Sequence, residues 1–229
     1  MPSAVSGKAV ADNDLQQAVN QLKREIQQGR FVPGQRLVEI DIMEHLGISR
    51  GRVREVYKRL EADGLVQIDK NRGASVRKVS RQEVENIFEV LEEISILMIK
   101  KVAQEIDSSE SRTQLQETLA AAQQFRKNSA NIKQVTAYMD ENARFWGSLA
   151  AISGNPVLAD VRRRLQAPLF RLAMEGLTIR NNREQWITRH EEIISTILEG
   201  DIKHATRHAR KSMHDVWHAI LELPETAFA

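Results

Sequence analysis

The hydrophobic pattern of residues 12–79 changes from a helical to an alternating period, and this change restricts the fold more than any other feature of the chain. Apolar residues recur every three or four positions over 15–26, and again over the shorter segments 39–46 and 50–62. Strict alternation then follows on both sides of an Asn- and Gly-containing turn, which is typical of a β-hairpin. The order of helix, helix, sharp turn, helix and two-stranded wing predicts a winged helix-turn-helix.

Only helical periodicity follows this region. Ser80 and Glu83 have the spacing of a capping box, which predicts a helix start. Six helical segments are then expected, at 81–106, 109–128, 131–152, 156–178, 183–199 and 202–221. We therefore predict a mainly α fold, in which the winged domain (12–79) is joined to an all-α bundle (80–222). Residues 1–11 are expected to form a disordered tail and residues 223–229 a second tail.

The composition excludes several kinds of site and location. The 229 residues contain no cysteine, which excludes disulfides, thiolate metal sites and cysteine nucleophiles. The longest apolar run, near Ile94–Ile99, is too short to cross a bilayer. Met1–Ala11 lacks the apolar core of a signal peptide. We expect a cytoplasmic protein with no membrane partner.

The net charge of +2 hides an asymmetry between the two halves. Residues 1–80 hold 14 basic and 10 acidic side chains, whereas the remainder holds 19 basic and 21 acidic ones. Within Ser49–Lys78, nine residues are basic and only four are acidic. Such a run is either an ordinary solvated surface or a surface that binds phosphate.

The position of these basic residues favours phosphate and base binding over an ordinary basic helix. In a helix-turn-helix, the first turn of the third helix here lies against base edges in the major groove. Arg50 and Arg54 are four residues apart and share a helix face, whereas Arg52 points to another side. Ser49 is placed to cap the helix and to donate to a phosphate. The candidate DNA-binding residues, with two from the wing tip, are Ser49, Arg50, Arg52, Arg54, Arg72 and Gly73.

The stretch GQRLVEIDIMEHLGISRGRVREVYKRLEADGLVQIDKNRGASV resembles the DNA-binding domain of GntR-family bacterial transcription regulators. The resemblance covers about residues 13–79. The family's usual pattern is Ser-Arg-Thr-Pro-Val-Arg-Glu-Ala, and Ser49, Arg50 and Arg54 match its DNA-contacting positions. Gly51 and Arg52 replace Thr and Pro, so we expect an operator that departs from the family norm.

The second half resembles the FCD-type effector domain of the FadR branch, on the segments IFEVLEEI (87–94), ISGNPVL (152–158) and RHEEIISTILEGDIKHA (189–205). The resemblance implies a helical bundle around a central pocket. In many such domains one Asp and three His hold a divalent metal, which helps to bind a small carboxylate effector.

The four ligand positions that this resemblance implies fall on Asn142, Trp146, His190 and Ser212, so only one ligand is retained. Leu91 stands where the family often has an arginine that faces the pocket. We therefore expect no metal and no other cofactor. A largely apolar or aromatic effector would receive hydrogen bonds from Asn142, His190 and Ser212. Alternatively, Leu91 and Trp146 fill the cavity as core and leave no effector site.

The sequence thus predicts a homodimeric, ligand-responsive transcription regulator, by default a repressor, that binds a palindromic operator in double-stranded DNA and is released by a small-molecule effector. The alternatives are a metal-dependent carboxylate sensor of the same family and a DNA binder without an effector. No Ser/His/Asp or paired-carboxylate arrangement supports an enzyme that uses His190 as acid or base. The His204/His208 and His214/His218 pairs are interpreted as a polar helix face.

Overall fold

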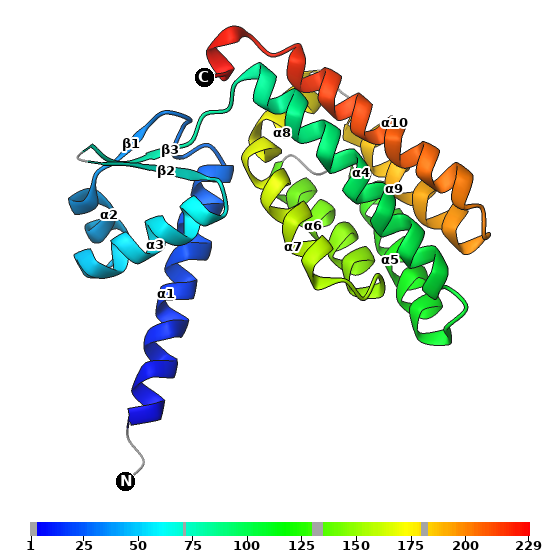
Figure 1. Ribbon diagram of the computed structural model, residues 1–229, viewed down its shortest axis with the longest axis horizontal. Coiled ribbons are helices and arrows are strands. Elements are labelled where there is room, and N and C mark those ends of the chain that lie inside the picture. The colour runs from blue at the N-terminus through cyan, green and yellow to red at the C-terminus, as the bar shows by residue number, and fades with distance from the viewer. Residues whose placement is uncertain (1–3, 71, 130–134, 180–182) are drawn as a thin grey trace. The chain divides into compact units, whose positions relative to one another are not determined.

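The computed structural model describes residues 4–70, 72–129, 135–179 and 183–229 (Figure 1). Contacts divide the chain into two compact units, one ending at Val79 and including Ala229, and the other formed by Ser80–Phe228. The mainly helical fold class is confirmed, with a winged helix-turn-helix followed by a helical bundle. Within the described ranges, no helix is both long and apolar enough to cross a membrane.

The N-terminal unit consists of three helices and a small antiparallel sheet. Its elements are α1 (Ala4–Gln27), β1 (Arg36–Leu37), α2 (Glu39–Leu46), α3 (Arg50–Ala62), β2 (Val66–Asp69) and β3 (Gly73–Val76). The strand order is β1-β3-β2, so the expected two-stranded wing gains a third strand. Arg36 pairs with Ser75 in this added strand, and the side chain of Leu37 is buried. A two-residue strand is too short to show alternation in the sequence.

The prediction of a disordered tail at residues 1–11 is wrong from Ala4 onwards, because α1 begins there. Residues 4–11 contain three alanines, and alanine is the best helix former. The buried stripe that contains Leu15, Val19 and Leu22 fixes the later turns of the helix. Extending a formed helix adds one hydrogen bond per residue, without a new nucleation cost.

The C-terminal unit is a bundle of seven helices in its described residues. They are α4 (Arg81–Glu105), α5 (Ser109–Asn128), α6 (Val135–Ile152), α7 (Pro156–Gln166), α8 (Phe170–Ile179), α9 (Arg183–Leu198) and α10 (Ile202–Leu221). The backbone N–H of Glu83 donates to Ser80 Oγ over 3.1 Å, as the capping box predicts. The single helix expected at 156–178 is instead broken by a 3₁₀ turn at Ala167–Leu169. Pro168 lies in that turn and has no N–H to continue the helix.

The expected tail at residues 223–229 is also wrong, because this segment folds onto the start of α4. Leu223 and Phe228 are buried. The Arg81 guanidinium lies 4.3 Å from the centre of the Phe228 ring and donates to the backbone carbonyls of Leu221 and Leu223. Two apolar side chains and a cation above an aromatic ring hold the segment in place.

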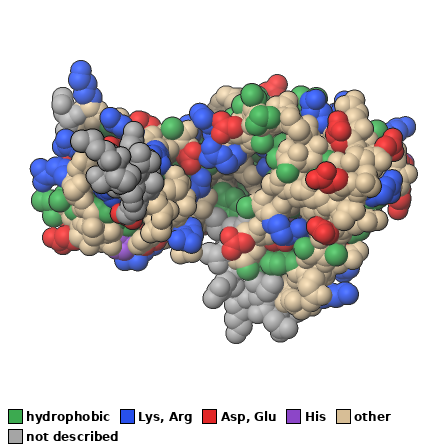
Figure 2. Space-filling view, turned by 90° about the horizontal axis from the view of Figure 1, so that it is seen from below, with side chains coloured by type: hydrophobic (Ala, Val, Ile, Leu, Met, Phe, Trp, Pro, Cys, Tyr) green, Lys and Arg blue, Asp and Glu red, His purple; other side chains and the backbone are tan. Residues whose placement is uncertain are grey.

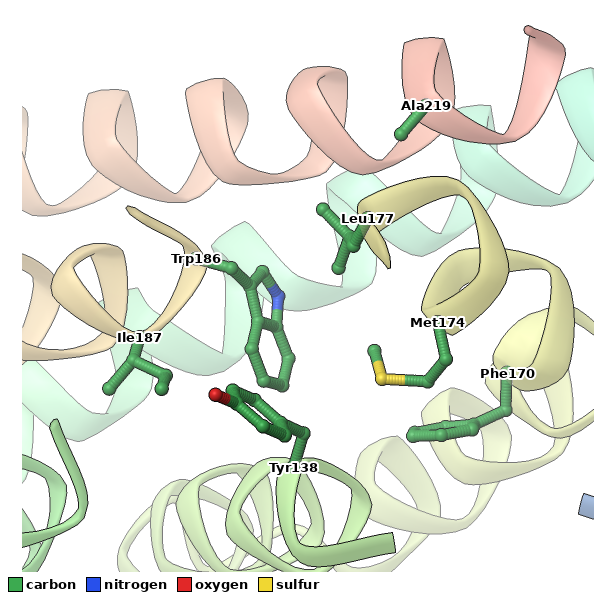
Figure 3. Packing of buried hydrophobic residues seen from close by; sticks show 7 residues of the cluster. All are labelled: Tyr138, Phe170, Met174, Leu177, Trp186, Ile187 and Ala219. Carbon is green, nitrogen blue, oxygen red and sulfur yellow. The ribbon is translucent and has the colours of Figure 1, made fainter. Parts of the chain in front are cut away.

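An aromatic-rich cluster forms the core between α6, α8, α9 and α10 (Figure 3). Close packing of α8 on α10 requires Gly176, because a Cβ there would collide with the backbone of Ala219. Figure 3 shows Trp186 beside Tyr138, with Met174 next to Phe170. The buried members of the cluster are Tyr138, Phe170, Met174, Leu177, Trp186, Ile187 and Ala219.

Candidate functional site

The first turn of α3 follows a sharp turn that glycine makes possible. Gly47 ends α2 in the left-handed conformation (φ +64°) and donates its N–H to the carbonyl of Met43. Ser49 then takes the N-cap position, but its side chain makes no capping hydrogen bond. The prediction of Ser49 as the N-cap residue is therefore confirmed in position, but the capping hydrogen bond of its side chain is absent. The exposed hydroxyl keeps its donor for a partner outside the chain.

Arg50 and Arg54 lie on one face of α3, as their spacing predicts, and both meet the same carboxylate. Glu39, the first residue of α2, accepts from Arg54 Nε over 2.6 Å, and its other oxygen lies 3.5 Å from Arg50 Nε. The hydrogen bond from Arg54 lowers the pKa of the Glu39 carboxyl and raises that of the guanidinium. The side chains of Arg50 and Arg54 are nonetheless 56% and 63% exposed, so each can exchange this carboxylate for an external acceptor.

Arg52 lies on a different side of α3. Its Nη1 is 3.6 Å from an Asp14 carboxylate oxygen of α1. Ser49 and Arg52 both line a polar cleft of about 440 Å³ between α1 and the helix-turn-helix turn. The sequence-predicted residues of α3 therefore form two groups, one facing Glu39 and one facing this cleft.

The wing carries the other two candidates at its tip. Arg72 and Gly73 are exposed, and Gly73 begins β3 with φ +83°. A Cβ at this position would meet only the end of the Arg36 side chain, at 4.0 Å, so the backbone conformation, not packing, favours glycine. In the space-filling view, Lys and Arg side chains are spread over the visible face of this unit (Figure 2).

In the C-terminal unit, all five candidate effector residues line one cavity. The cavity has a volume of about 40 Å³ and is walled mainly by apolar side chains of α4, α8, α9 and α10. This space holds roughly three water molecules. A ligand of a few heavy atoms fits without movement, whereas a larger one must displace part of the wall. The predicted residues that meet here are Leu91, Asn142, Trp146, His190 and Ser212.

Arg162 of α7 also lines this cavity, and sequence reasoning missed it. Only 3% of the residue is exposed, and its guanidinium carbon lies 3.4 Å from the centre of a Trp146 ring. Nε donates to Ser95 Oγ over 3.2 Å, and Nη1 donates to Gln166 Oε1 over 2.8 Å. Both partners are neutral, and no carboxylate of the described chain pairs with this guanidinium. Burial lowers its pKa well below the ordinary value.

A signal for Arg162 exists in the sequence. It stands in a run of three arginines, which is typical of a solvated surface, and Arg163 and Arg164 do pair with Asp160. Arg162, however, follows the buried Leu158 by four residues and therefore shares its helix face.

His190 is enclosed by aromatic rings and is 1% exposed. Its ring stacks on Phe145, with 3.9 Å between centroids and an angle of 5° between planes. Burial, followed by the positive charges of Arg162 and Arg144, lowers the pKa of His190 to about 3. The imidazole is therefore neutral near pH 7, and its buried Nδ1 has no hydrogen-bond partner in the described chain.

Comparisons with known families account for both units. Residues 15–76 match the bacterial regulatory proteins of the gntR family, and residues 86–215 match the FCD domain. The chain belongs to the GntR family of bacterial transcription regulators, with an FCD domain. Sequence relatives agree with this assignment, and a solved structure shares the fold.

This GntR regulator is 26% identical to the HTH-type transcriptional regulator YdhC of Bacillus subtilis over 206 residues, which cover 88% of this chain and 89% of YdhC. It is 25% identical to the HTH-type transcriptional repressor RspR of Escherichia coli over 186 residues, which cover 81% of this chain and 79% of RspR. The structure of E. coli McbR/YncC has the same fold, with a TM-score of 0.72 at 18% identity, covering 91% of this chain and 97% of that one. Both sequence relatives are named as regulators of transcription.

The residues of this FCD domain do not fit the divalent metal that many such domains hold. Of the four ligand positions, only His190 offers a strong ligand, because amide and hydroxyl groups are weak ligands and indole is none. Across the described ranges, no group of three His, Asp or Glu side chains has a metal-binding arrangement. The buried guanidinium of Arg162 adds a positive charge to the same cavity.

The lowered pKa of His190 predicts a loss of stability in mild acid. As the pH falls below 6.5, the unfolded chain takes up a proton at His190, whereas the folded chain does so only near pH 3. Between pH 6.5 and pH 5 this difference costs about 1.5 kcal/mol of unfolding free energy. In urea unfolding over that range, His190→Gln should lose less stability than wild type by this amount. Substitution of the exposed His218 by Gln is the control. Equal losses for wild type and His190→Gln would contradict a buried neutral imidazole.

Proposed function

We propose that this GntR regulator represses transcription by binding a two-fold operator as a homodimer, and that a small organic effector in the FCD cavity releases it. The observation that carries the proposal is the first turn of α3. There, two exposed arginines are held by a single carboxylate that DNA can replace. The relative RspR is named a repressor, which supports this sign of regulation. Bacterial DNA lies in the cytoplasm, and the regulator would act there.

Arg50 and Arg54 would contact the bases. The remaining candidate DNA-binding residues would position the protein on the duplex. Arginine recognises guanine O6 and N7 with two parallel hydrogen bonds, and this geometry resembles that of the carboxylate pairing with Glu39. Ser49 and Arg52, beside the polar cleft, would contact phosphates. The exposed tip at Arg72 and Gly73 would reach the neighbouring minor groove.

The homodimer would form through α4 and α7, which pack side by side in the bundle (Figure 1). Each helix leaves a pair of apolar side chains in solvent at helical spacing. Their exposed fractions are 49% for Val90, 47% for Leu97, 70% for Val157 and 38% for Val161. Exposed apolar patches mark interaction surfaces, and a two-fold operator requires a second copy of the chain as the partner.

Effector binding would be coupled to DNA through α4. This helix carries the cavity residue Leu91 and begins only a few residues after the wing strand β3 ends at Val76. An effector that favours one position of α4 shifts the population of DNA-competent dimers, typically by 1–3 kcal/mol of coupling energy. The cavity, with its unpaired Nδ1 of His190, favours this model over a DNA binder without an effector.

Selection of bound fragments from a random DNA pool tests the proposal. The full-length protein should enrich an inverted repeat whose half-sites lie about one helical turn apart, or a multiple of it. Failure to enrich any sequence would contradict base reading. Enrichment of an unrepeated half-site would contradict the dimer.

A further inference from the structure

We propose that Arg162 is the anion-binding group of the FCD cavity, so that this regulator recognises a small carboxylate without a metal ion. The inference rests on the proposed function only in taking the cavity as the effector site. It replaces the largely apolar effector suggested by the sequence with one that carries a single negative charge.

The guanidinium of Arg162 is buried, and no carboxylate of the described chain is its counter-ion. A buried cation is stable only when it is paired or well hydrogen-bonded, and removal from water costs several kcal/mol. Contact with the Trp146 ring and two neutral acceptors compensates part of that cost. Nη2 of Arg162 donates no hydrogen bond within the described chain. An incoming carboxylate would supply both the missing charge and an acceptor.

The cavity wall contains nothing that competes with such a ligand. No Asp or Glu is among its described lining residues, and His190 is neutral. The nearby buried carboxylate of Glu141 is paired with Arg144, 2.6 Å between Oε1 and Nη2. Arg162 is therefore the one charged group among the described residues of the wall.

The neutral polar groups of the cavity complement a carboxylate. Asn142, Ser212 and His190 are each at least nine-tenths buried and line the same space. The unpartnered Nδ1 of His190 provides a donor in one tautomer. A planar guanidinium binds a carboxylate through two parallel hydrogen bonds, which an ammonium group cannot reproduce.

The volume limits the size of the ligand. About 40 Å³ is the space of roughly three water molecules, so acetate nearly fills the cavity and a longer acid such as propionate requires the wall to move. A ring, as in benzoate, requires a larger displacement of the wall. Phe88, Phe170 and Met174 would then contact its apolar body.

The test compares carboxylates with their uncharged amides on full-length protein treated with a chelator. Acetate, propionate and benzoate are titrated against acetamide, propionamide and benzamide, with thermal melting and tryptophan fluorescence as readouts. At least one carboxylate should bind about 10- to 100-fold more tightly than its amide. The proposal is overturned if no carboxylate binds, if acid and amide bind equally, or if binding requires added Zn²⁺ or Mn²⁺.

Substitutions of Arg162 and of its neighbour Arg163 then test which arginine binds the carboxylate. Arg162→Met should abolish the preference for the carboxylate and raise the melting temperature of the ligand-free protein, because an unpaired buried charge is removed. Arg162→Lys should bind more weakly than wild type, and Arg163→Gln on the exposed side of α7 should bind like wild type. Unchanged carboxylate binding in folded Arg162→Met would overturn the proposal.

Operator affinity measured in the same samples separates this proposal from the proposed function. Carboxylate binding that depends on Arg162 but leaves DNA affinity unchanged supports the site and contradicts effector-driven release. Operator binding by a protein that ignores every carboxylate contradicts the site and leaves DNA recognition intact.

Discussion

Replacing Arg54 by alanine is expected to lower operator affinity by about 10- to 100-fold, which corresponds to 1–3 kcal/mol for a lost bidentate base contact. The guanidinium is exposed at the start of α3, and it is already held in a two-hydrogen-bond geometry by Glu39. Fluorescence anisotropy with labelled operator at fixed salt measures the loss. Affinity for a scrambled duplex should change much less, because most of the lost contact is specific to a base.

Two variants on neighbouring residues serve as controls for Arg54→Ala. Arg59 is exposed near the far end of the same helix and bonds to Gln16, so Arg59→Ala should leave specific affinity nearly unchanged. Glu39→Gln removes the carboxylate that competes with DNA for Arg50 and Arg54, and should raise affinity. Wild-type affinity in Arg54→Ala would show that this residue does not read a base.

Leu97→Glu combined with Val157→Glu is expected to separate the dimer and to reduce affinity for the two-fold operator by about 10²–10⁴-fold, the gain that linkage of two binding units provides. Both side chains are apolar and exposed on adjacent helices, so a carboxylate there does not disturb the core of the bundle. Desolvating two carboxylates at an apolar interface would be strongly unfavourable. Analytical ultracentrifugation measures the oligomeric state.

The matched control for this double variant is Ile202→Glu. Ile202 is also an exposed apolar residue, at the start of α10 and outside the patch on α4 and α7. This variant should remain dimeric and bind the operator like wild type. A dimeric Leu97→Glu/Val157→Glu protein would place the interface elsewhere.

The sequence predicts well what depends on local spacing. The bounds of α3 and the shared face of Arg50 and Arg54 follow from helical geometry, and the structure brings both to Glu39. The break after α7 and the order of the chain end, in contrast, depend on packing. Pro168 lies in the 3₁₀ turn that separates α7 from α8. The end of the chain is held in place by its contact with Arg81.

The cavity is predictable from the sequence only in part. Five residues from four helices are expected at one site because motifs fix their positions in the family, and all five line the cavity. Arg162 was missed because an arginine in a charged run is usually solvated, and its burial against Trp146 is a tertiary contact between α6 and α7. Residues that face a cavity from another helix are visible only once the bundle is assembled.

Sequence-specific DNA binding by a dimer is tested most directly by equilibrium binding of the full-length protein to the selected operator and to a scrambled duplex of the same length at physiological salt. We expect a preference for the operator of about 10³-fold or more, with two chains bound per duplex. Equal affinity for the two duplexes would contradict it.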